Sequence, residues 1–183
     1  MGYLNTLSKT FRVLGFDAVA MTDLANDQKA TGHGFLTLAL VGLAGGIMSF
    51  LLQLVFSFGS PAWNSLFVLL YMPFYTIVGF IIGYSIYHML AKLFKGQATG
   101  AQYFRVMSNC MLVTVISLIP ILGWILQWIV GLYLIVINIF VMRNVHQLSW
   151  ARSVIVVLIP VIVSFVLAFV GLLFFIFSVP RFF

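Results

Sequence analysis

The side chains that could do chemistry in this chain are few, and most of them lie far apart in the sequence. There are three acidic residues, three histidines and one cysteine: Asp17, Asp23, Asp27, His33, His88, His146 and Cys110. Acid–base catalysis, nucleophilic catalysis and zinc binding each need such groups brought together, usually with a recognisable spacing. No ligand or catalytic spacing is present here. The sequence therefore predicts no enzyme, no cofactor and no metal site.

Each of these groups has a structural interpretation. Asp23 and Asp27 are four residues apart and can share a solvated helix face. The three histidines stand at the ends of apolar segments, which favours anchoring at a membrane surface over metal binding. Cys110 lies within an apolar run, where a buried thiol is a packing residue and not a reactive one.

The composition indicates an integral membrane protein. Hydrophobic residues make up 63% of the 183 residues and charged residues only 7%, and the mean hydropathy is +1.19. A soluble domain has about a quarter of its residues charged, so this chain could not cover its surface with polar groups. The length allows one compact bundle without a separate soluble domain.

Five apolar segments are close to the roughly 20 residues that a helix needs to cross a bilayer. They are residues 35–58, 63–90, 106–122, 124–142 and 153–178, and none contains Asp, Glu, Lys or Arg. We expect an all-α membrane bundle of five transmembrane helices in residues 35–183, preceded by an N-terminal region of residues 1–34. In that region an apolar stripe at helical spacing predicts an amphipathic helix: Leu4, Leu7, Phe11 and Leu14. This helix either lies in the membrane interface or docks against the bundle.

The positive charges predict an orientation. If five helices thread back and forth, eight of the nine basic residues fall on one side: Lys9, Arg12, Lys29, Lys92, Lys95, Arg105, Arg143 and Arg152. Only Arg181 falls on the other side. The positive-inside rule then places the N-terminus in the cytoplasm and the C-terminus outside. The isoelectric point of about 9.8 does not indicate nucleic-acid binding, because the charges are scattered singly.

Two local patterns suggest how the helices begin and pack. Thr99 and Gln102 have the spacing of a capping box, which predicts a helix start after the basic connector at residues 92–105. Gly42, Gly46, Gly79 and Gly83 form two small-residue pairs that let helix backbones approach closely. We expect these pairs to pack helices within one chain, and dimerisation through them is the alternative.

Three stretches taken in order resemble the Yip family of Ypt/Rab-interacting membrane proteins. They are YHMLAKLFKGQATGAQYFRV (87–106), IPILGWILQWIVGLYLIVI (119–137) and NVHQLSWARSVIVVLIPVIV (144–163). The resemblance implies a short cytoplasmic region followed by five spans. The N-terminal region has no Asp-Leu-Tyr-Gly-Pro-like motif, so the chain is similar to the prokaryotic branch, and Rab binding is not carried over. Ser108 and Asn109 also depart from the small and aromatic pair that family members often carry.

The sequence thus favours a non-enzymatic membrane scaffold or adaptor in membrane organisation or trafficking, in a prokaryotic cytoplasmic membrane. The expected partners are the bilayer, anionic lipids and a membrane or cytoplasmic protein, with a homo-oligomer left open. The contact residues expected on the cytoplasmic side are Lys9, Arg12, Lys92, Lys95, Arg105, Arg143 and Arg152. The alternative is a small channel or permease for an uncharged solute, although its spans offer only neutral amides such as Asn109 and Asn138.

Overall fold

The computed structural model describes residues 2–56, 62–120 and 122–178, and every regular element in these ranges is a helix. The order is α1 (Tyr3–Leu14), α2 (Ala18–Asn26), α3 (Ala30–Phe56), α4 (Ala62–Leu93), α5 (Gly100–Cys110), a 3₁₀ helix (Met111–Leu118), α6 (Gly123–Asn144) and α7 (Trp150–Ser178). The all-α class expected from the sequence is confirmed. Within the described ranges, four helices are long and apolar enough to cross a bilayer: α3, α4, α6 and α7.

The third segment expected to span, residues 106–122, is not one continuous α-helix. The chain is α-helical to Cys110 and continues as a 3₁₀ helix from Met111 to Leu118. In the 3₁₀ part, Thr114 and Ser117 donate their hydroxyl protons to backbone carbonyls three residues earlier, both at 2.6 Å. Side-chain bonds of this kind compete with regular helix pairing, because they offer the backbone another partner. Hydropathy alone could not reveal this change of helix type.

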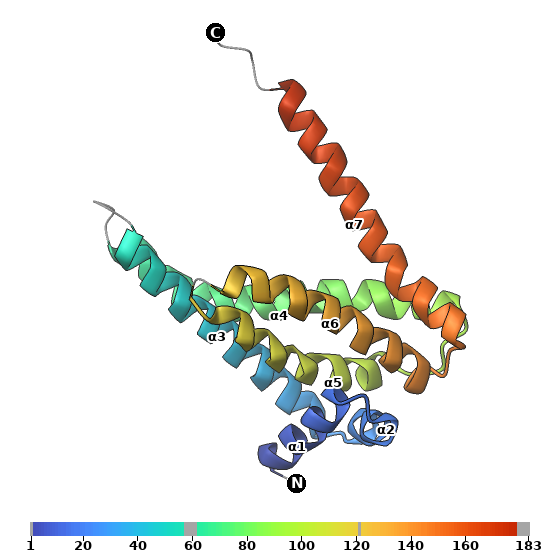
Figure 1. The fold of residues 1–183 in the computed structure, drawn as a ribbon. Coiled ribbons are helices and arrows are strands. Elements are labelled where there is room, and N and C mark those ends of the chain that lie inside the picture. Colours follow the sequence, from blue (N-terminus) through green and yellow to red (C-terminus); the bar gives the residue numbers. More distant parts are fainter. Residues whose placement is uncertain (1, 57–61, 121, 179–183) are drawn as a thin grey trace.

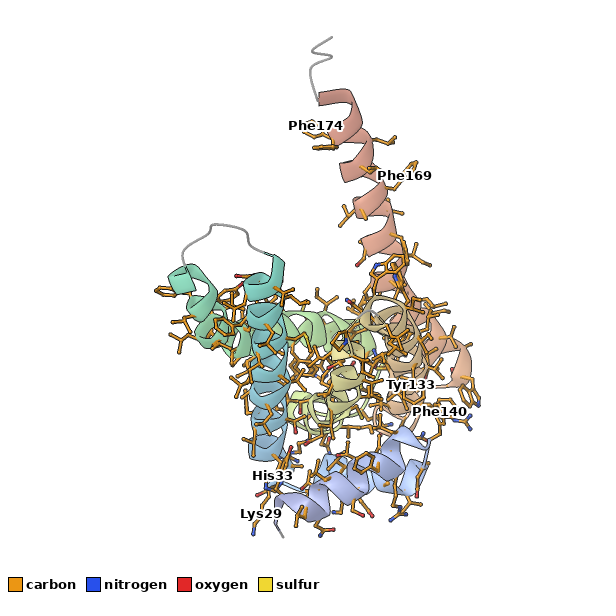
Figure 2. All side chains as sticks on the ribbon, turned by 60° about the vertical axis from the view of Figure 1, so that its left-hand side comes forward. Lys29, His33, Tyr133, Phe140, Phe169 and Phe174 are labelled. Atoms are coloured by element: carbon orange, nitrogen blue, oxygen red, sulfur yellow. The ribbon has the colours of Figure 1, made fainter. Side chains whose placement is uncertain are left out.

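Helices α3 to α6 lie alongside one another, and α1 and α2 cover one end of the group (Figure 1). Helix α7 begins against α4 and α6 and then leads away from them. Its buried residues, Ser153, Val156 and Val157, all lie in its first third. Every residue from 162 to 175 is exposed, and Figure 2 shows Phe169 and Phe174 on this separate part. Its apolar surface is suited to hydrocarbon and not to water.

The N-terminal region forms two helices, and α3 starts at Ala30, before the expected residue 35. Helix α1 packs against α2, α3 and α5. It buries Thr6, Thr10 and Val13, whereas Leu4 and Phe11 from the expected apolar stripe are 81% and 63% exposed. The face directed at the bundle is therefore the one that carries the threonines.

The starts of α5 and α2 are set by side-chain caps. Thr99 accepts from the backbone N–H of Gln102, and the Gln102 side chain accepts from the backbone N–H of Thr99, so the expected capping box at α5 is confirmed. Asp17 caps α2 by accepting from the N–H groups of Val19 and Ala20. The Ala20 bond and the Arg12 side chain lower the pKa of Asp17, because both stabilise the carboxylate.

The most extensive contact between two helices, that of α3 with α4, depends on two glycines of α3. A Cβ on Gly42 would come within 2.6 Å of Pro73 Cα and 2.8 Å of the Met72 carbonyl oxygen. A Cβ on Gly46 would come within 3.2 Å of the Val68 carbonyl oxygen. At Gly79 and Gly83 the structure differs from the expectation of close packing, because an added Cβ would meet no atom within 4 Å.

The close approach at Gly42, which Gly45 does not share, predicts opposite effects of one added methyl group at these two positions of α3. Gly42→Ala should lower the melting temperature in detergent, since the Cβ meets the α4 backbone and overpacking costs roughly 1–3 kcal/mol. Gly45→Ala is the matched control, because a Cβ there meets nothing within 4 Å. The control should keep or slightly raise the melting temperature, as alanine is the better helix former. Equal melting temperatures for both variants would contradict the close α3–α4 contact.

Candidate contact surface

The two basic connectors of the sequence meet at one end of the bundle. The turn after α4 and the turn after α6 are joined by a hydrogen bond in which the Gln97 N–H donates to the His146 carbonyl oxygen at 2.9 Å. Each turn contains one non-glycine residue in the left-handed region, Lys95 with φ 68° and Gln147 with φ 56°. Such residues reverse the chain tightly. The turns therefore form one continuous surface instead of two separate loops.

Four basic residues occur on these turns and the adjoining helix ends, and we call them the basic-turn surface: Lys92, Lys95, Arg143 and Arg152. Lys92, Lys95 and Arg152 are exposed. The guanidinium of Arg143 lies over the ring of Trp150, 4.1 Å from its centroid, in cation–π geometry. This contact holds the end of α6 against the start of α7.

The other three basic residues of the expected contact set are engaged within the chain. Lys9 pairs with Asp27 at 3.5 Å, and Arg12 pairs with Asp17 at 2.7 Å. Arg105 is half-buried and donates to the Ala25 carbonyl oxygen at 2.8 Å and to the Thr31 hydroxyl at 2.9 Å. These bonds tie α5 to α2 and α3. Sequence position placed Arg105 beside the lysines, but its side chain points into the protein.

A buried histidine lies beneath the basic-turn surface. His146 has no exposed surface, and its Nε2 is 3.5 Å from Nδ1 of His88. The His146 and Tyr103 rings pack with centroids 5.3 Å apart. Gly96 covers this ring so closely that a Cβ would lie 2.7 Å from His146 Nδ1. The glycine in the first turn is thus needed for a close approach.

Burial determines the charge of His146. The pKa of His146 is lowered to about 4, first by desolvation and then by His88 and Lys92. Its Nδ1 is buried without a hydrogen-bond partner among the described residues. A neutral imidazole is the form that this site accepts, because a buried charge needs a partner. The sequence showed only that the histidine stands near a span end, and burial could not be inferred from that.

The three histidines do not come together. His33 is bonded through Nδ1 to the hydroxyl of Thr6 at 2.7 Å, on the side where α1 meets α3. Only His88 and His146 are neighbours. Within the described parts of the chain, no group of three His, Cys, Asp or Glu residues is positioned to hold a metal ion.

Two of the span amides that a transport path could use, Asn109 and Asn138, are bonded between helices. The Asn109 amide nitrogen donates to the carbonyls of Ala30 at 3.2 Å and Arg105 at 2.7 Å. Asn138 accepts from the Tyr103 hydroxyl at 2.8 Å. Both asparagines are buried. Such bonds join helices in a membrane.

The N-terminal helices add a layer beside this surface. Phe16, between α1 and α2, packs against Tyr133 and Phe140 of α6, with ring centroids 5.8 Å and 4.9 Å apart. Figure 2 shows Tyr133 and Phe140 next to these helices, and the Tyr133 hydroxyl donates to the Leu14 carbonyl. The outer side of the layer leaves Phe11 and Val19 more than 60% exposed.

The buried His146 predicts a pH dependence of stability. Its pKa is about 4 when folded and about 6.5 when unfolded. The folded state is therefore most stable above pH 6.5, where His146 is neutral in both states. It loses stability as the pH falls towards 4, because the unfolded state then binds a proton that the folded state does not. The melting temperature should drop over this window, less steeply in His146→Phe, which keeps a ring beside His88, Lys92 and Tyr103. An unchanged slope in His146→Phe would contradict the assignment.

Comparison with known proteins identifies the family. The Yip1 domain matches residues 13–172, which run from the end of α1 through most of α7 and include both basic turns. No match was found among curated protein sequences or among solved structures. The resemblance noted over residues 87–163 is thus part of a longer match that extends over the first two long helices. The chain, a multi-pass integral membrane protein by its helices, belongs to the Yip1-domain family.

Proposed function

We propose that this protein is a non-catalytic scaffold or adaptor of a prokaryotic cytoplasmic membrane, which acts by presenting the basic-turn surface to anionic lipid or to an acidic protein partner. The observation that carries the proposal is the hydrogen bond from Gln97 to the His146 carbonyl, which joins the two turns. On the joined turns and the adjoining helix ends, Lys92, Lys95 and Arg152 are exposed. Each basic residue near an anionic leaflet contributes about 1 kcal/mol to attraction. Several such residues on one surface contribute more than scattered ones.

The proposal includes five membrane crossings, with the N-terminus in the cytoplasm. Helix α5 and the 3₁₀ helix contain 11 and 8 residues, which together span about 32 Å at the usual rises of the two helix types. The hydrocarbon core is about 30 Å thick. The two pieces are therefore long enough to make one crossing. Two crossings then precede the first basic turn and four precede the second, so both turns lie on the same side as α1 and α2.

The bonding of the span amides supports an adaptor over the permease alternative. Asn109 and Asn138 are two of the neutral amides that a solute path could use, beside Gln53 and Gln127, and both hold helices together. A transporter would lose saturable flux in proteoliposomes on Asn109→Leu while staying folded. An adaptor shows no such flux, and its amide variants differ only in stability.

The orientation can be tested by cysteine labelling. In a Cys110→Ala background, cysteines at Gln97 and Gln147 should react with an impermeant maleimide only from the cytoplasmic face, because both residues are exposed on the turns. A cysteine at Leu122, which is 55% exposed, should react only from the opposite face. Ser60 would report on the earlier loop, which lies outside the described residues. Reaction of Gln97 and Leu122 from the same face would exclude a crossing by α5 and the 3₁₀ helix.

The contact role can be tested with two charge-matched variants. Lys92→Gln with Lys95→Gln should reduce binding of the purified protein to phosphatidylglycerol-rich vesicles or co-purification of its partner, and salt should mimic this loss through screening. Lys9→Gln with Arg12→Gln removes the same charge from residues already paired with Asp27 and Asp17, so its effect should be smaller. Equal losses in both variants would mean that only net charge matters, and the surface would not be a specific contact site.

A further inference from the structure

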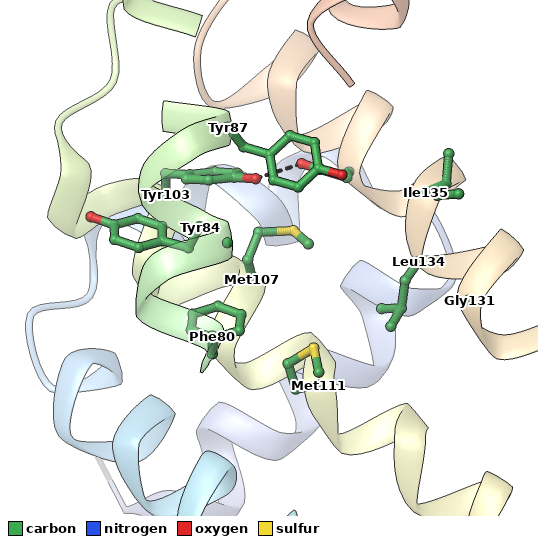
Figure 3. Close-up of a pocket in the computed structure, with 11 residues that line it drawn as sticks. Phe80, Tyr84, Tyr87, Tyr103, Met107, Met111, Gly131, Leu134 and Ile135 are labelled. Atoms are coloured by element: carbon green, nitrogen blue, oxygen red, sulfur yellow. Dashed lines mark hydrogen bonds between the residues drawn. The ribbon is translucent and has the colours of Figure 1, made fainter. Parts of the chain in front are cut away.

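A groove opens between two of the long helices. It lies between α4 and α6, and its floor is α5 and the start of the 3₁₀ helix, with a cavity volume of about 250 Å³. Figure 3 shows Phe80 and Tyr87 on the α4 side, Met107 and Met111 on the floor, and Leu134 on the α6 side. Its lining carries no charged residue.

Two glycines create this space. Gly83 of α4 and Gly131 of α6 both line the groove, and a Cβ at either position would meet no atom within 4 Å. Side chains at these positions would narrow the groove without meeting another helix. The spacing of Gly79 and Gly83 predicted close helix packing, whereas in the structure Gly83 leaves open space in the groove.

The groove is polar at one end only. Tyr103 donates its hydroxyl proton to Asn138 Oδ1 there, and the N–H groups of the Asn138 amide donate to none of the described residues. Asn138 precedes the end of α6 by six residues, and Tyr87 precedes the end of α4 by six. Both lie about 9 Å from the basic turns, whereas Phe80 and Gly131, thirteen residues before their helix ends, lie about 20 Å away.

This arrangement suits an amphiphilic molecule whose polar head lies towards the basic turns and whose apolar tail lies in the rest of the groove. The two walls are helices long and apolar enough to span a bilayer, so the opening between them faces hydrocarbon. The volume exceeds the roughly 150 Å³ of an apolar cavity that holds benzene, but it falls below the 300–1,000 Å³ of typical drug-sized sites. A slender chain fits these limits better than a fused ring system.

We propose that the groove binds one acyl chain of a bilayer phospholipid. The acyl chain runs along Met107, Met111 and Leu134, and its ester carbonyl accepts a hydrogen bond from the Asn138 amide. The phosphate lies towards Lys92, at the same end of α4. The proposal does not depend on a protein partner at the basic-turn surface.

The test uses the full chain in nanodiscs that contain phosphatidylglycerol with a diazirine in one acyl chain. After irradiation, mass spectrometry should locate crosslinks on the groove residues Met107, Met111 and Leu134. Gly83→Leu with Gly131→Leu fills the groove and should lose these crosslinks. Gly79→Leu is the matched control, because it lies on the same helix in equally open space but does not line the groove. It should be labelled as the wild type is.

Three results would overturn the proposal. They are crosslinks confined to the outer surface of α7, equal groove labelling in the filled variant and the wild type, and groove labelling by a free diazirine fatty acid but not by the phospholipid. If the double variant does not yield folded protein, Gly131→Val alone must show reduced groove labelling at a wild-type melting temperature. Unreduced labelling in that folded variant would equally refute the site.

Discussion

The structure depends on the burial of one short helix, α5, among five others. It packs against α1, α2, α3, α4 and α6, and its residues from Val106 to Cys110 are all buried. A helix that is buried over most of its length must satisfy most of its polar groups inside the protein. It does so through Arg105, which reaches α2 and α3, through Asn109, which reaches the start of α3, and through Tyr103, which reaches α6. These bonds fix the positions of the surrounding helices.

Tyr103 connects the groove and the basic-turn surface. Its hydroxyl stands at the polar end of the groove with Asn138, and its ring lies against His146 beneath the basic turns. The groove and the basic-turn surface therefore share one fully buried side chain. Any movement of Tyr103 needed to admit an acyl chain would be felt at His146 and at Gly96 above it. The interior is closely packed, so such movements are not absorbed locally.

The long helices use their surfaces differently, although all are similarly apolar. Helices α3 and α4 pack backbone to backbone at Gly42. Helices α4 and α6 stand apart over α5 and leave the groove. The buried residues of helix α7 lie near its start, and its residues 162–175 are all exposed. A bilayer permits this variety, because lipid covers an apolar helix as well as another helix does.

The sequence alone was sufficient for the features that depend on local composition. Long runs without charge predicted α3, α4, α6 and α7, because hydrocarbon excludes charge whatever the neighbours are. The spacing of Thr99 and Gln102 predicted the start of α5, since a capping box involves only four consecutive residues. The number of charges in each connector predicted that both turns after α4 and α6 are basic. The family resemblance at residues 87–163 was confirmed by the match over residues 13–172.

Features that depend on which residues face each other were decided only by the tertiary structure. Gly42 and Gly83 have the same local pattern, yet one contacts a neighbouring backbone and the other lines a cavity. Arg105 and Lys95 belong to the same basic connector, yet one is bonded inside and the other is exposed. His146 is buried because Gly96 from another turn covers it. Hydropathy and spacing are properties of a single segment, whereas contact and burial depend on segments distant in sequence, so only the folded chain could determine them.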